Sequence, residues 1–244
     1  MSKKDRYIKA VYGVNVSITL HDKVLKTVEN WLNNRGKTVK MIFTPNTEMI
    51  VLAQKDGFFK NVLNKADLSL PDSLGVAKKA GVKRITGEKM MMSLIKLADQ
   101  KGFRVFLLGG KAGVAEKAAE ILKKQYPKLK IKGFEGPENV SKASKIEHIK
   151  AIKMINDFKT DLLLAGFGHQ KQEEWIYLNR QKLKVKTAMG VGGSIDKIVK
   201  PWLRAPKWVQ SLGLEWLYRL AVEPWRIKRQ MALIKFLCLK VKKS

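Results

Sequence analysis

The chain has 244 residues, enough for one large domain or a domain with an appendage, and its hydrophobic share of 45% is ordinary for a globular protein. Its 49 Lys and Arg against 21 Asp and Glu give a formal net charge of +28, which indicates an anionic partner: nucleic acid, an anionic membrane face or a phosphate-bearing substrate. A generally lysine-rich proteome is the alternative explanation, and the single cysteine, Cys238, excludes an internal disulfide and fits a reducing cytosol.

Apolar, β-branched runs alternate with segments of helical period along most of the chain. In chain order, strands are predicted at 39–44, 66–72, 104–110, 131–136, 161–168 and 185–193. Helices are predicted within 45–56, 73–81, 111–127, 144–159 and 170–181. This alternation predicts an α/β fold with a mostly parallel sheet covered by helices on both faces.

Three predicted strands end in glycine-rich turns: LLGG (107–110), AGFG (165–168) and GVGG (190–193). Ligands of such sheets bind beyond the carboxyl ends of the strands, and glycine there lets the backbone approach them closely. Each helix that follows offers an N-terminus to phosphate. A tight turn explains any one of these glycine pairs, whereas the three together favour an anionic ligand. None is a G-x-G-x-x-G or Walker A motif.

Polar side chains follow the same strand ends. Asp72 and Asp196 come after two of them, and Thr44 and Asn46 flank Pro45 after a third. Each aspartate alone is explained as well by a helix cap. Because the carboxyl ends of parallel strands share one edge, we expect the four side chains to line a common pocket.

Metal and covalent nucleophile sites have little support. The histidines His21, His148 and His169 are scattered, and no D-x-D pair is present. There is no G-x-S-x-G elbow either. We expect His169 to be a solvated loop histidine, with substrate contact as the alternative, and we expect neither a metal nor another cofactor.

The C-terminal stretch EWLYRLAVEPWRIKRQ (215–230) gathers aromatic and basic residues around a proline. From residue 219 onward, eight basic residues face one acidic residue, a net +7. Beyond the proline, apolar residues recur at spacings of four and three: Ile227, Met231, Ile234, Cys238 and Val241. A basic amphipathic helix is typical of a membrane interface, where each basic residue contributes about 1 kcal/mol. Packing of this stripe on the core or on a second subunit is the alternative.

No run reaches the length of a membrane span, and MSKKDRYIKA lacks the apolar region of a secretory signal, so neither a membrane span nor a signal peptide is expected.

Seven stretches in order resemble the WecG/TagA/CpsF glycosyltransferases: TPNTEM (44–49), LPDSLGV (70–76), KRITG (83–87), LLGG (107–110), GFGHQKQEEW (166–175), GVGGSID (190–196) and RAPKWVQSLGLEWLYRLAVEPWRIKR (204–229). The resemblance extends over most of the chain, and its last motif is the most specific.

The resemblance implies a Rossmann-like core, taken as 1–200, and a C-terminal helical membrane-targeting appendage, 201–244. Family members transfer a hexose derivative from a UDP-sugar to a polyprenyl-diphosphate-linked sugar, without a metal and with inversion, at the cytoplasmic membrane face. The TagA branch adds N-acetylmannosamine to undecaprenyl-diphosphate-linked N-acetylglucosamine and so commits it to wall teichoic acid. The resemblance leaves the donor sugar open, and a homo-oligomer is compatible with it.

The resemblance also implies roles for individual residues. Asp72 aligns with the general base, and Thr44 and Asn46 would hold the sugar or acceptor beside it. The substrate pocket would include Arg84, Gln172, Gly109, Gly110, Gly190, Gly192, Gly193 and Asp196. With no metal, the diphosphates would be bound by Arg219, Arg226 and Arg229.

Three positions depart from the family pattern: Gln170 replaces a usual proline, Lys200 a glycine and Ile195 a phenylalanine. They bring the local loop shape and the donor sugar into question. We further expect the appendage to be mobile in water and to close over the pocket at the lipid surface. The rival interpretations are a basic nucleic-acid-binding protein, which no motif supports, and an inactive membrane-associated scaffold of the same fold.

Overall fold

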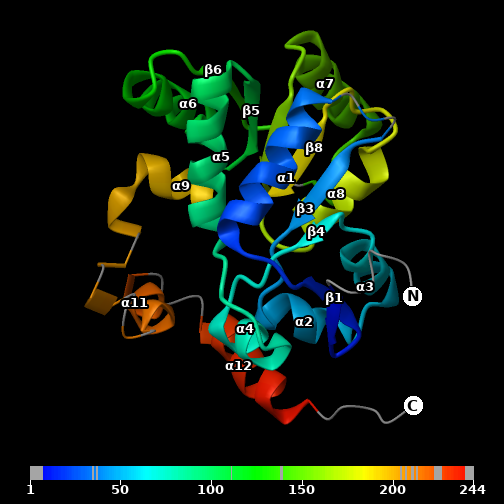
Figure 1. Ribbon diagram of the computed structural model, residues 1–244, viewed down its shortest axis with the longest axis vertical. Helices are drawn as coiled ribbons and strands as arrows, with labels where there is room; N and C mark the ends of the chain where they lie inside the picture. The colour runs from blue at the N-terminus through cyan, green and yellow to red at the C-terminus, as the bar shows by residue number, and fades with distance from the viewer. Residues whose placement is uncertain are drawn as a thin grey trace.

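The computed structural model describes residues 8–34, 36, 38–110, 112–137, 140–203, 205–206, 208–209, 212, 214–222 and 227–239. At its centre is a six-stranded sheet between two layers of helices (Figure 1). In spatial order the strands are β4 (Leu68–Ser69), β3 (Lys40–Phe43), β8 (Thr187–Gly190), β7 (Leu162–Gly166), β5 (Arg104–Gly109) and β6 (Lys130–Phe134). All neighbouring pairs are parallel, which confirms the predicted α/β class.

Both faces of the sheet are buried. Successive residues of a strand point to opposite faces, and Phe43 and Phe106 therefore join one apolar cluster while Ile42 and Leu107 join another. This is why the strands read as continuous apolar runs rather than as alternating ones.

Different helices complete the two clusters. On the Phe43 face these are α2 (Thr47–Ala53), α3 (Gly57–Asn64), α4 (Leu74–Ala80), α7 (Lys145–Asp157) and α8 (Lys171–Asn179). On the Ile42 face they are α1 (His21–Asn33), α5 (Gly87–Lys101), α6 (Val114–Gln125) and α9 (Ser194–Val199). The predicted helices between strands are thereby confirmed, and α1, α3 and α5 are additions.

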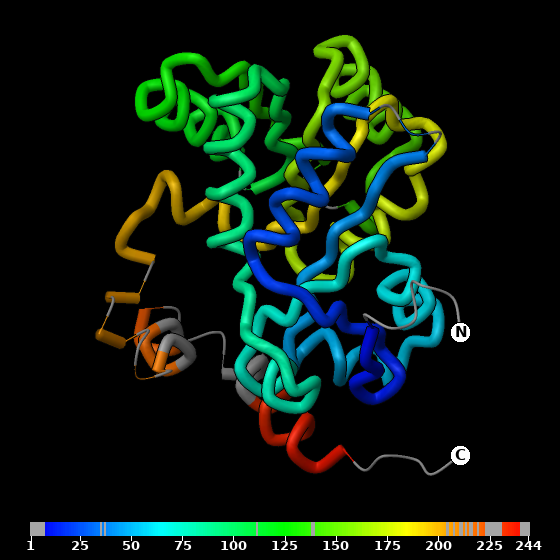
Figure 2. Tube along the Cα trace, viewed as in Figure 1, coloured from blue at the N-terminus to red at the C-terminus, as the bar shows by residue number. Residues whose placement is uncertain are grey.

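An N-terminal hairpin, also absent from the predicted elements, precedes α1. β1 (Ile8–Val11) and β2 (Val14–Ser17) pair antiparallel around Tyr12 and Gly13, both at positive φ, 51° and 76°. Its valines join the Phe43-side cluster. In the trace of Figure 2 the blue hairpin lies on the same side of the molecule as the red helix near the other end of the chain.

The C-terminal segment contains a 3₁₀ turn (η2, Pro201–Leu203), α11 (Glu215–Val222) and α12 (Ile227–Cys238). α12 packs against α2 and lies beside α4 (Figure 1). Of the predicted membrane stripe, Met231, Ile234 and Cys238 are exposed, whereas Phe236, on another side of the helix, is buried in the core. Val241 and the side chain of Ile227 lie outside the described residues. In the part of the chain that the structure describes, no helix combines the length and hydrophobicity needed to cross a bilayer.

Candidate active site

The loops after β3 and β4 lie side by side at the carboxyl edge of the sheet. Leu70 N–H donates to Phe43 O at 2.8 Å, which extends the pairing of the two strands. Asp72 N–H then donates to Pro45 O at 3.2 Å. The parallel pairing of β3 with β4 thus brings the Thr44–Asn46 turn against the loop that carries Asp72, as the strand-end pattern predicts.

Asp72 is held at the start of α5. Its Oδ1 accepts a hydrogen bond from Gly87 N–H at 2.7 Å, and Arg84 Nε donates to its backbone oxygen at 2.7 Å. Thr44 Oγ1 lies 3.1 Å from the point that a Cβ on Gly87 would occupy. The structure therefore brings Asp72, Thr44 and Arg84 together around Gly87. The carboxylate thus lies at the positive end of the α5 dipole.

Of the four polar residues that follow strand ends, Thr44, Asn46, Asp72 and Asp196, one is a helix cap. Asn46 caps α2, because its Oδ1 accepts from Met49 N–H at 3.0 Å. Ser73 rather than Asp72 caps α4. Asp196 lies within the first turn of α9 and is not its cap, and the neighbouring Lys197 donates to Glu88 and so ties α9 to α5.

The GVGG turn is braced by α8. Gly192 N–H donates to Gln172 Oε1 at 2.9 Å, and Gln172 Nε2 donates to Glu173 Oε1 at 2.7 Å. A Cβ on Gly190 would lie 2.7 Å from Glu173 Oε1 and 2.8 Å from Gln172 Nε2. Gly190 is therefore required by the space that these two buried side chains fill, and Gln172 fixes the shape of the turn.

Glu173 is a buried acid that sequence reasoning missed. Its side chain is fully buried, and no hydrogen-bond partner reaches its Oε2 within the described structure. Burial raises the pKa of Glu173 to about 7, although the hydrogen bond from Gln172 acts in the opposite direction. One sequence signal could have indicated this burial: Glu173 lies three residues before Ile176, which places both on the buried side of α8.

Gly109 of the LLGG turn lets the chain pack closely against Gly166 at the end of β7. Gly109 and Gly110 have φ of 105° and 92°, and a Cβ on Gly109 would lie 2.8 Å from the carbonyl carbon of Gly166. Gly110 N–H already donates to Gly166 O, and the N-terminus of α6 receives a carboxylate where Gly113 N–H donates to Glu135 Oε2 at 2.8 Å. Contact of Gly109 and Gly110 with a substrate stays a prediction.

Gln170 has a backbone that proline cannot adopt. Its φ is 67° and its ψ is −60°, whereas the proline ring fixes φ near −65°. Its Nε2 donates to Asp56 Oδ2 at 3.0 Å and to Glu174 Oε1 at 3.1 Å. The neighbouring His169 is one-fifth exposed and pairs with Glu48 Oε1 at 3.2 Å, so it is not the freely solvated histidine that the sequence predicted.

We expect Gln170→Gly to be more stable than Gln170→Ala by about 1 kcal/mol, since both lose the same side-chain bonds but only alanine keeps the strain of positive φ. Urea unfolding of the two variants measures the difference. An alanine variant at least as stable as the glycine variant would contradict the assigned backbone conformation.

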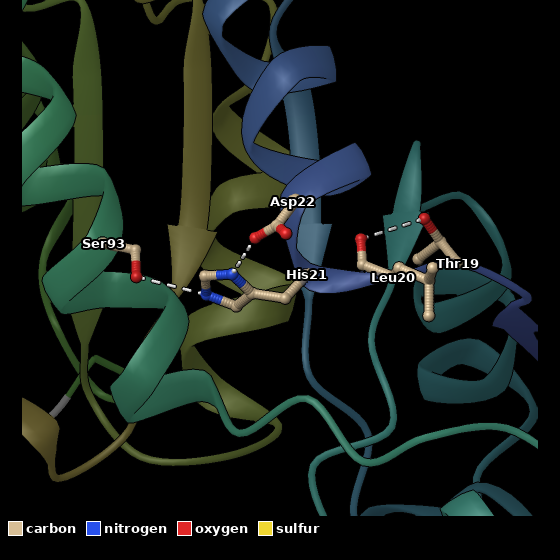
Figure 3. Close-up of polar contacts among 5 residues, drawn as sticks. All are labelled: Thr19, Leu20, His21, Asp22 and Ser93. Carbon is tan, nitrogen blue, oxygen red and sulfur yellow. Dashed lines mark hydrogen bonds and ion pairs between the residues drawn. The ribbon is translucent and has the colours of Figure 1, made fainter.

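His21, the first residue of α1, forms a second polar cluster (Figure 3). Its Nε2 lies 3.2 Å from Ser93 Oγ and its Nδ1 lies 3.3 Å from Asp22 Oδ1, in the order of a catalytic triad. The Asp22 side chain is 93% exposed, and Ser93 lies inside α5, where backbone N–H groups are bonded within the helix and cannot form an oxyanion hole. We interpret the cluster as a link between α1 and α5.

The side chains of the three arginines predicted to bind the diphosphates lie outside the described part of the structure. Arg226 lies outside the described residues, and of Arg219 in α11 and Arg229 in α12 only the backbone is described. Their roles stay predictions. Among the described residues, no cluster of three or more His, Cys, Asp or Glu side chains has an arrangement that could hold a metal ion.

Comparison with known proteins places this geometry in context. The family model described as "Glycosyl transferase WecG/TagA/CpsF family" matches residues 9–244. An N-acetylglucosaminyldiphosphoundecaprenol N-acetyl-beta-D-mannosaminyltransferase from Bacillus subtilis (strain 168) is 31% identical over 202 residues, covering 80% of this chain and 77% of that protein. The protein of the same name from Staphylococcus aureus (strain MRSA252) is 29% identical over 225 residues, covering 90% and 86%.

Proposed function

Because the chain belongs to the WecG/TagA/CpsF family of glycosyltransferases, we propose that it moves N-acetylmannosamine from a UDP-sugar to N-acetylglucosamine on undecaprenyl diphosphate. The relatives' name supports the acceptor, the transferred sugar and a β product. The place of action would be the cytoplasmic membrane face, and the product would enter teichoic acid or another cell-surface polysaccharide.

Asp72 would act as the general base. Its carboxylate takes the proton of the acceptor hydroxyl as the hydroxyl oxygen attacks the anomeric carbon, and the bond from that carbon to the UDP oxygen breaks. One displacement inverts the anomeric centre, so no second carboxylate is needed as a nucleophile. The hydrogen bond from Gly87 N–H to Asp72 Oδ1 supports this role, because it fixes the carboxylate beside Thr44.

The nucleotide would lie along the same edge, at the GVGG turn and Asp196. The Gln172 side chain supports this site by holding Gly192 N–H and thereby the turn. The diphosphates would be bound by the arginines of the C-terminal segment, whose guanidinium groups suit bidentate phosphate contacts. Exposed Met231 and Ile234 on α12, with the basic residues around them, would meet the anionic membrane surface.

Transfer itself is the test. The purified chain is incubated in EDTA with a panel of UDP-sugars, including N-acetylmannosamine, its uronic acid, glucose and glucuronic acid, and a synthetic lipid-diphosphate acceptor. Mass spectrometry should find one added N-acetylhexosamine with the first donor. Transfer from another donor would change the proposed substrate, and no product with any donor would contradict the function.

A further inference from the structure

α12 has two apolar sides, and one of them is inserted into the core. Phe236 is 3% exposed and belongs to the cluster on the Phe43 face of the sheet, and Leu239 packs against the same cluster. Met231 and Leu237 are 50% and 73% exposed. Phe236 is thus the most buried described side chain of α12, and it fixes the helix to the core while the opposite side faces solvent.

The ring of Phe236 occupies a closely fitted socket. It meets the Tyr12 ring edge to face, with centroids 5.5 Å apart, at the tip of the N-terminal hairpin. A Cβ on Gly75 would lie 3.2 Å from Phe236 Cε1 and 3.0 Å from Thr47 Cγ2. Gly75 lies in an ordinary helix, so the need for glycine there comes from the close approach of Phe236 and Thr47.

This socket adjoins both loops of the candidate active site. Thr47 follows Asn46, and Gly75 lies three residues after Asp72. The same two loops are joined directly where Asp72 N–H donates to Pro45 O at 3.2 Å. A shift of the Phe236 ring would therefore move the first turns of α2 and α4, and with them the residues on either side of that hydrogen bond.

We propose that Phe236 is a positioning residue, which wedges between the first turns of α2 and α4 and so holds Asp72 in register with Thr44 and Asn46. The C-terminal helix then contributes to catalysis from within the core, independently of any contact with lipid. This inference rests on the proposed role of Asp72, because it assigns Phe236 the task of keeping that carboxylate in place.

The kinetic test uses the full chain, the UDP-sugar that mass spectrometry identifies and a water-soluble acceptor with a short lipid, which removes membrane binding from the rate. Phe236→Ala should lower kcat about 10- to 100-fold, because a displacement of a catalytic group by about 1 Å has an effect of this size. The KM for the donor should change less than about twofold. Phe236→Leu should recover most of kcat, and Leu237→Ala, one residue away but exposed, should match the wild type.

A second variant separates positioning from folding. Gly75→Ala keeps the ring but intrudes on it, so it should lower kcat, and the smaller, more flexible side chain in Gly75→Ala/Phe236→Leu should restore part of it. An unchanged kcat in folded Phe236→Ala, or a double variant no faster than Gly75→Ala alone, would overturn the proposal.

Hydrogen exchange tests the proposal without relying on the reaction. Phe236→Ala should speed amide exchange in peptides covering the first turns of α2 and α4, whose caps are Asn46 and Ser73, while a peptide covering β5 stays protected. Unchanged exchange in those two turns would refute the wedge. A wild-type chain that transfers no sugar would refute the proposed function alone, because the exchange result would still decide the role of Phe236.

Discussion

Replacing Asp72 by Asn should lower kcat about 10³-fold, which is the usual contribution of a general base. Asparagine has the same shape and its Oδ1 can still accept from Gly87 N–H, so the loop should keep its position. What disappears is the ability to accept the proton of the acceptor hydroxyl. Initial rates measure the loss, and calorimetry should show unchanged UDP binding.

Asp67→Asn is the matched control. Asp67 is a partly buried carboxylate at the other end of β4, where it pairs with Lys40 and accepts from Met41 N–H. Its replacement removes a charge next to the same strand without touching the candidate site, so kcat should stay within about twofold of the wild type. If Asp72→Asn retained more than about a tenth of the wild-type kcat, Asp72 would not be the base.

Glu173 should make the stability of the protein depend on pH in an unusual direction. Burial raises its pKa to about 7 in the folded chain, against 4.5 for an ordinary glutamate. Below pH 4.5 the carboxyl group is protonated in both the folded and the unfolded chain, so it does not make the free energy of unfolding depend on pH. Between pH 4.5 and 7 the unfolded chain loses the proton first, so the free energy of unfolding falls as pH rises, by about 3 kcal/mol in total.

Glu173→Gln cannot ionise and should escape this loss. Its free energy of unfolding relative to the wild type should rise by about 3 kcal/mol from pH 4.5 to pH 8, as measured by urea unfolding. Glu147→Gln is the control of opposite sign, because hydrogen bonds from Ser144 hold the pKa of Glu147 below its usual value. That variant should lose stability relative to the wild type as pH rises. A flat or falling difference for Glu173→Gln would contradict a buried acid with a raised pKa.

The sheet was predictable because its strands are continuously apolar and alternate with helices. The predicted strand 66–72 proved to be two residues long, Leu68–Ser69, and Pro71 beyond it has no N–H to donate to a ladder. The N-terminal hairpin carried a weaker signal: its strands have four residues each, and its turn is Tyr12–Gly13 rather than the Asn-Gly or Asp-Gly pair that marks such hairpins.

The meeting of Thr44 with Asp72 was also predictable, because both follow parallel strands and so share one edge. Arg84 lies in a loop with no pattern of its own, and only the family resemblance indicated it. Glu173 and Phe236 were missed, because their burial depends on elements distant in sequence. Phe236 lies on another side of α12 than the predicted membrane stripe, and the structure places it in the core.

The anomeric configuration of the product tests the central claim most directly. A single displacement with Asp72 as the only base requires inversion, so an α-linked UDP-sugar should give a β-linked product, which the one-bond carbon–hydrogen coupling at the anomeric centre measures by NMR. A β product that disappears in Asp72→Asn is the expected result. An α product would require a second displacement and contradict the mechanism.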